Sequence, residues 1–214
     1  AYGRAPKVPK VVGMADEAQR VRILHAFANH ELQAVELFAW ALLAFPEAPA
    51  AFRRGLLTIL REEQMHTRLY LARLEAHGSR FGALPVSGYF WGKVDQLTTP
   101  ARFVCALSLT FEGANLDHAR EYGEAARAAG DEETARVLER IHRDEIRHVR
   151  FGAEWLERFK EPGESLYDAY RRNVEWPLRP ALAKGERFDP ESRRAAGLDE
   201  DFIERLAAAQ RKDR

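Results

Sequence analysis

Two glutamate-x-x-histidine pairs give this sequence its clearest chemical signal. The pairs are Glu63/His66 and Glu145/His148; Glu31 precedes the first by 32 residues, and Glu112 precedes the second by 33. Residues i and i+3 of an α-helix lie about 60° and about 4.5 Å apart, so both members of a pair can bind one ion. Carboxylate and imidazole are ligands that suit iron and manganese. The six predicted metal ligands are Glu31, Glu63, His66, Glu112, Glu145 and His148.

The repeated spacing also predicts the elements that carry these residues. About 32 residues correspond to one helix out and a second helix back, so the chain contains the same carboxylate-bearing hairpin twice. Two such hairpins packed face to face would place four glutamates and two histidines around one point, as a dimetal site in a bundle core requires. The four carboxylates would balance two divalent ions. Without metal, buried glutamates would repel one another or bind protons.

A third pair of this kind, Glu139/His142, shows that the Glu-x-x-His motif alone is weak evidence for a metal site. Glu139 shares a helix face with charged residues and follows Glu112 by only 27 positions, so we exclude it as a ligand pair. His142 lies one turn before Glu145. We interpret His142 as a core histidine or as a partner that orients a ligand, and a role as a seventh ligand stays open.

The fold expected from the sequence is all-α, a four-helix bundle with a helical extension. Apolar stripes and stop signals predict long helices over 16–45, 50–77, 99–129 and 131–160. Residues 78–98 predict a long crossover, and 165–176 and 199–210 predict shorter helices. The predicted organisation is therefore an arm (1–15), the bundle (16–160) and an extension packed on it (161–214). Glycines 113 and 152 indicate either close helix packing or space beside the metals.

The amino-acid composition of the chain disfavours several classes of function. Lysine plus arginine equals aspartate plus glutamate at 33 each, which does not favour nucleic acid or an anionic membrane as a partner. The single cysteine, Cys105, suits a reducing compartment. The longest apolar stretch is far shorter than the ~20 residues that a membrane span needs. We expect a cytoplasmic protein without a membrane or nucleic-acid partner.

Short segments around the predicted ligands resemble the ferritin-like di-iron carboxylate superfamily. Glu31-Leu32-Gln33-Ala34 resembles the first-helix segment of rubrerythrins, and 144–148 matches the Asp-Glu-x-Arg-His motif of bacterial multicomponent monooxygenases. In the first pair, Glu62 and Met65 stand where that motif has Asp and Arg. The segments 30–34, 62–66 and 110–115 are most similar to an uncharacterised bacterial ferritin-like family, domain of unknown function 455. This resemblance covers roughly residues 15 to 200.

The resemblance implies a ferritin-like four-helix bundle whose six ligands bind two ions, with iron expected and manganese as the alternative. It also implies that Asp144 orients a ligand histidine. The expected function is oxidase or oxygenase chemistry, with dioxygen, a small-molecule substrate and an external electron donor as partners. A homodimer stays open. The sequence identifies neither the substrate nor the redox partner.

Two other function classes stay open at this point. One is a ferroxidase or iron-handling protein that acts on no organic substrate. The other is a scaffold that keeps the fold without chemistry, which the complete set of six ligands disfavours. An RNA-modifying enzyme of the same superfamily receives no support from the neutral charge.

Overall fold

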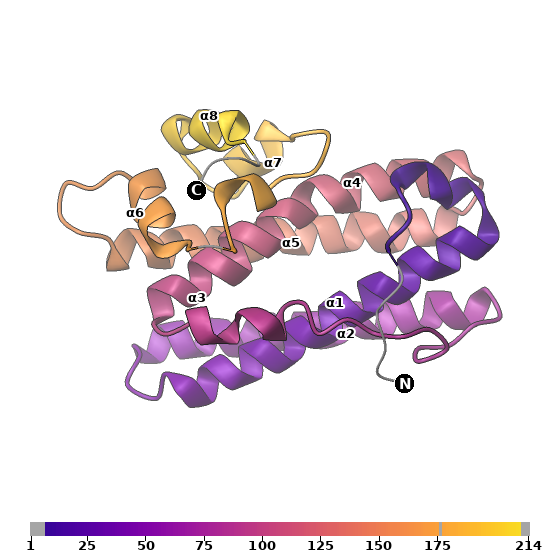
Figure 1. Ribbon diagram of the computed structural model, residues 1–214, viewed down its shortest axis with the longest axis horizontal. Helices are drawn as coiled ribbons and strands as arrows, with labels where there is room; N and C mark the ends of the chain where they lie inside the picture. The colour runs from indigo at the N-terminus through magenta and orange to yellow at the C-terminus, as the bar shows by residue number, and fades with distance from the viewer. Residues whose placement is uncertain (1–6, 176, 211–214) are drawn as a thin grey trace. The chain divides into compact units, whose positions relative to one another are not determined.

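The structure is a computed structural model, and it describes residues 7–175 and 177–210. These residues form eight α-helices joined by short 3-10 and π segments, without a β-strand (Figure 1). The all-α prediction is therefore confirmed. The chain divides into two compact units, Ala1–Val94 with Glu121–Ile141, and Asp95–Arg120 with His142–Arg214. We call them the first and the second unit. The predicted domain boundaries stay predictions, and Trp176 and both chain ends lie outside the described residues.

Two long helices pack against each other in the first unit. A 3-10 turn, η1 (Val11–Ala15), leads into α1 (Glu17–Ala44), and α2 (Ala50–Ala76) packs against α1. Asp16 caps α1 by accepting a hydrogen bond from Gln19 N at 2.9 Å, as its residue type predicts. The apolar faces of both helices enter a buried core that includes Leu24, Tyr70 and Leu138. The segment after α2 contains the 3-10 helix η2 (Trp91–Gln96).

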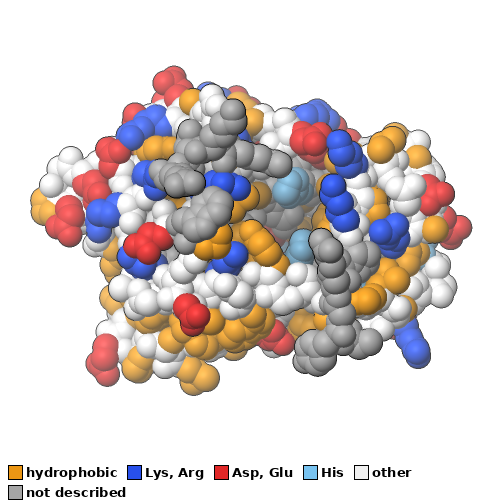
Figure 2. Space-filling view, in the orientation of Figure 1, with side chains coloured by type: hydrophobic (Ala, Val, Ile, Leu, Met, Phe, Trp, Pro, Cys, Tyr) orange, Lys and Arg blue, Asp and Glu red, His pale blue; other side chains and the backbone are white. Residues whose placement is uncertain are grey.

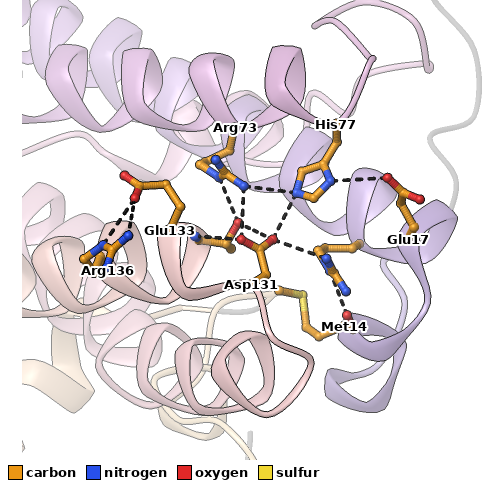
Figure 3. A network of polar contacts seen from close by, with 9 residues as sticks. Met14, Glu17, Arg73, His77, Asp131, Glu133 and Arg136 are labelled. Atoms are coloured by element: carbon orange, nitrogen blue, oxygen red, sulfur yellow. Dashed lines mark hydrogen bonds and ion pairs between the residues drawn. The ribbon is translucent and has the colours of Figure 1, made fainter.

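An ionic network around Asp131 links three helices of the first unit (Figure 3). Asp131 caps the start of α5 (Glu132–Phe159) by accepting from Thr134 N at 3.0 Å. Its carboxylate also accepts from Arg73 Nη2 of α2 at 3.0 Å and pairs with Arg20 Nη1 of α1 at 3.3 Å. His77 Nε2 lies 3.0 Å from Asp131 Oδ2. One carboxylate thus holds α1, α2 and the beginning of α5 together.

The helix predicted over 99–129 is interrupted, which corrects the expectation of one continuous α-helix. Thr99 and Pro100 start α3 (Pro100–Ala106) as predicted, and Thr99 caps it. A π-helical segment, η3 (Leu107–Phe111), then precedes α4 (Glu112–Ala128). The backbone N–H of Glu112 bonds to Leu107 O, five residues earlier, and Thr110 Oγ1 donates to Cys105 O at 2.7 Å. These wider bonds add a residue to the turn that leads to Glu112.

Four short helical segments follow α5 in the second unit: α6 (Leu166–Asn173), η4 (Pro180–Leu182), α7 (Pro190–Ala195) and α8 (Glu200–Ala208). Tyr170 of α6 and Phe202 of α8 pack with ring centroids 5.2 Å apart. The expected last helix corresponds to α8, whereas α7 was not predicted. Asp189 and Pro190 start α7 with the same cap-then-proline pattern that starts α3.

The described surface mixes charges of both signs. On the face shown in Figure 2, acidic, basic and hydrophobic side chains are interspersed, in keeping with the equal numbers of acidic and basic residues. None of the described helices combines the length and the apolar character that crossing a membrane requires.

Candidate metal centre

The first unit brings Glu31, Glu63 and His66 together as one buried group, which we call the first cluster. Glu31 comes from the middle of α1, and Glu63 and His66 come from adjacent turns of α2. His66 Nδ1 lies 3.8 Å from Glu31 Oε2 and 3.6 Å from Glu63 Oε1. The exposed fractions of the three residues are 6, 1 and 0 %. The side chains of Glu31, Glu63 and His66 are therefore buried where the apolar faces of α1 and α2 pack together.

Burial makes the negative charge of the first cluster costly. Loss of solvent, and then the neighbouring Glu63 carboxylate, raise the pKa of Glu31 well above its usual range. His66 acts in the opposite direction but with less effect. A cation between these side chains would remove the repulsion, because it would replace the proton that the pair otherwise needs.

The second unit brings Glu112, Glu145 and His148 together in the same way, and we call them the second cluster. His148 Nδ1 lies 3.2 Å from Glu145 Oε2 and 3.9 Å from Glu112 Oε1. The exposed fractions are 7 % for Glu112, 1 % for Glu145 and 0 % for His148. Asn115, one turn after Glu112 on α4, donates to Glu145 Oε1 at 2.8 Å. This bond fixes one carboxylate oxygen of the pair carried by α5.

Both clusters have the geometry of a metal-binding group. Within each, one ligand atom from every residue lies within 4.8 Å of the others. Three ligand atoms evenly spaced about 2.1 Å from a common ion lie about 3.6 Å apart, and the four histidine-to-carboxylate distances of 3.8, 3.6, 3.9 and 3.2 Å are close to this value. Two carboxylates and one imidazole balance the charge of one divalent ion, and this donor set suits iron and manganese. The residues present therefore fit a transition metal.

The structure also shows the contacts of Asp144, His142 and Glu139, the other three residues considered in the sequence. Asp144 Oδ1 accepts from Arg147 at 2.7 Å, and its proposed contact with a ligand histidine stays a prediction. His142 Nε2 lies 2.9 Å from Ser192 Oγ, and burial lowers the pKa of His142. Glu139 is exposed and pairs with Arg127, as expected when the third pair was excluded.

Of the two glycines near the ligands, packing requires glycine at Gly152 alone, and neither position faces open space. A Cβ atom on Gly152 would lie 2.5 Å from Ser108 Cβ, closer than side chains approach, so glycine is needed there. A Cβ atom on Gly113 would lie 3.6 Å from Ala183 O, in ordinary contact with the segment around η4. Space for dioxygen or substrate at these glycines is therefore not supported.

Two features near the second cluster were missed from the sequence. Asn115 follows Glu112 by three residues, the same spacing that joins Glu145 to His148, so the helical spacing could have identified it. The buried pair of Asp117 and Arg193 joins α4 to α7, with Arg193 Nη1 2.7 Å from Asp117 Oδ1. Only the cap signal at Asp189 and Pro190 could have indicated α7, and it does not reveal the partner.

The fold and the site thus define an all-α protein with buried glutamate and histidine groups that could hold a metal ion. The profile of the family described as "Protein of unknown function (DUF455)" matches residues 3–204. The chain belongs to this family, as the resemblance of its ligand segments predicted. No curated protein and no solved structure matches the chain significantly.

Proposed function

We propose that the two clusters together bind two transition-metal ions and that the protein is an oxidoreductase that uses dioxygen. One observation carries the proposal: each unit buries a glutamate with a Glu-x-x-His pair, and the ligand atoms within each set lie within 4.8 Å of one another. An incidental surface arrangement would leave the carboxylates in water, where their charge costs little.

The sequence repeat supports one shared centre rather than two separate ones. A ferritin-like bundle of α1, α2, α3–α4 and α5 would bring both clusters to its core. In that arrangement Glu31 and Glu112, from the helices without a ligand histidine, would bridge or cap the ions. Glu63/His66 and Glu145/His148 would each hold one. Four carboxylates and two divalent ions are electrically neutral, which lowers the free-energy cost of burying the filled site.

Bound by these residues, two such ions would supply redox chemistry with dioxygen and Lewis acidity at one point. The contribution of the chain is to hold the ligands in place and to exclude water. Asn115 fixes Glu145 Oε1, and the burial of both histidines keeps solvent from the imidazoles. A small organic substrate, an external electron donor, a bacterial cytoplasmic setting and a homodimer remain parts of the proposal that the superfamily resemblance suggests.

Metal titration tests the proposal most simply. Metal-free protein, titrated without oxygen with Fe²⁺ or Mn²⁺ and analysed for bound metal, should take up two ions per chain. Glu145→Gln, which keeps the side-chain shape and removes one charge, should weaken binding by at least about tenfold, because a ligating oxygen is lost. Glu139→Gln is the matched control, since Glu139 lies on the same helix, is exposed and pairs with Arg127. It should bind both ions as the wild type does.

Exposing the Fe²⁺-loaded protein to air should then produce an absorption change in the wild type that is lost in Glu145→Gln. A wild type that takes up neither metal would contradict the proposal. Uptake of iron far above two ions per chain, with elution as a large hollow assembly, would instead favour iron storage.

A further inference from the structure

A fully buried arginine of the C-terminal extension is bonded next to a predicted metal ligand. Arg193 of α7 has an exposed fraction of 0 %. Its Nη1 donates to Asp117 Oδ1 at 2.7 Å, and its Nη2 donates to Asp117 Oδ2 at 2.9 Å. Nη2 also donates to the backbone oxygen of Gly113 at 3.0 Å. Gly113 directly follows Glu112, so the guanidinium bonds to the first turn of the helix that carries this ligand.

The same guanidinium also organises the segment before α7. It donates to Ala183 O and Asp189 O, both at 2.9 Å. Asp117 accepts in turn from the backbone N–H groups of Gly185 and Asp189, both at 2.8 Å. Hydrogen bonds offset the cost of burying an ion pair, and here the Asp117 carboxylate and the Nη1 and Nη2 atoms of Arg193 each have several. The network therefore fixes 183–193 to α4 in one register.

The segment contacts the other ligand-bearing helix of the second unit as well. His142 of α5, one turn before Glu145, lies with Nε2 2.9 Å from Ser192 Oγ. Ser192 Oγ donates its proton to Asp189 Oδ2 at 2.6 Å, so it accepts from His142. Arg150, two residues after His148, donates to Ala195 O. The extension therefore bonds to α5 on both sides of Glu145/His148 and to α4 beside Glu112.

We propose that the segment 183–195 is a clamp that sets the position of Glu112 relative to Glu145 and His148, with Arg193 as its positioning residue. The inference rests on the proposed metal centre, because the clamp matters for the ions that the second cluster binds. Arg193 acts through the Gly113 carbonyl and Asp117 and contacts no ion itself. Partners that orient ligands typically affect metal affinity by about 10- to 100-fold.

The test compares Arg193→Met with Arg194→Met. Arg194 is the next residue of α7, and its guanidinium forms exposed pairs with Glu191 and Glu200, which makes it a matched control. Hydrogen exchange of the backbone in 107–118 is measured on folded, metal-free protein. Binding of Mn²⁺ is followed on the same variants by the change in its electron paramagnetic resonance spectrum.

Arg193→Met should exchange faster than Arg194→Met in 107–118, and it should bind one of its two Mn²⁺ ions about 10- to 100-fold more weakly with an altered spectrum. Arg193→Lys should lie between Arg193→Met and the wild type, because lysine keeps the charge beside Asp117 but cannot bond to all the acceptors at once. If Arg193→Met does not fold, Arg193→Lys takes its place.

Equal exchange in the two methionine variants, or unchanged Mn²⁺ affinity and spectrum in Arg193→Met, would overturn the clamp while leaving the metal centre intact. If the wild type bound neither Mn²⁺ nor Fe²⁺, the metal proposal would fail, and the exchange rates alone would decide whether the clamp holds α4.

Discussion

Glu31 illustrates, at the scale of one residue, the conflict between stability and binding in this chain. Its carboxylate is buried, and burial together with Glu63 raises the pKa of Glu31 well above the usual range. A carboxyl group with a raised pKa in the folded state favours folding below its unfolded pKa, and this contribution is lost as pH rises through the folded value. At neutral pH without metal, this carboxyl group must either keep its charge in a buried place or take up a proton, and both cost folding free energy.

Replacing this carboxylate should stabilise the metal-free protein. We expect Glu31→Gln to raise the free energy of unfolding at pH 7 by about 1 to 2 kcal/mol, measured by urea denaturation with a chelator present. The same variant should lose metal affinity, because it lacks a ligating charge. Glu47→Gln, at an exposed loop position, should change stability by less than about 0.5 kcal/mol. A marked loss of stability in Glu31→Gln would show that Glu31 has a structural role that does not involve metal.

Among the individual elements, the long helices could be predicted from the sequence, because helix caps and apolar stripes are local signals. Asp16, Thr99 and Asp131 start their helices as expected. The π segment before Glu112 and the helix α7 were missed. The first is marked by the backbone bond from Glu112 N–H to Leu107 O, and the second is held by a pairing of Asp117 with Arg193 across 76 positions. Neither the choice between two helix types nor a distant partner can be inferred from a local pattern.

Asp131 provides a test at the same scale. Although burial acts to raise the pKa of Asp131, hydrogen bonds from Thr134 and the charge of Arg73 outweigh it and lower the pKa overall. Asparagine caps a helix as well as aspartate does, so Asp131→Asn removes mainly the ionic contacts. We expect a loss of about 1.5 to 3 kcal/mol at pH 7 by urea denaturation.

The pH dependence gives the sign of the Asp131 effect. A depressed carboxyl pKa contributes stability above the unfolded value, about 3.9, and this contribution is lost as pH falls through the folded value. The difference between wild type and Asp131→Asn should therefore shrink below about pH 4. Asp16→Asn, at the exposed cap of α1, should show little difference at either pH. A gap that stayed constant down to pH 3 would rule out the ionic contribution.

On the scale of the whole molecule, the same set of side chains, two glutamates and one histidine, occurs twice, once in each compact unit. Predicting the six residues required only their types, spacing and apolar surroundings, and the structure gathers them as two buried triplets. Asp117 and Arg193 could not be predicted as supports, because their effect depends on a tertiary contact between distant residues. We propose that both triplets contribute to one centre with two ions.

The most direct measurement is a crystal structure of the protein grown with Mn²⁺ or Fe²⁺, with anomalous scattering recorded at the metal absorption edge. We expect two anomalous peaks about 3.5 to 4 Å apart, one bound by His66 and the other by His148, with the four glutamates around them. Two well-separated peaks, a single peak outside both clusters, or no peak in a metal-saturated crystal would contradict a shared dimetal centre.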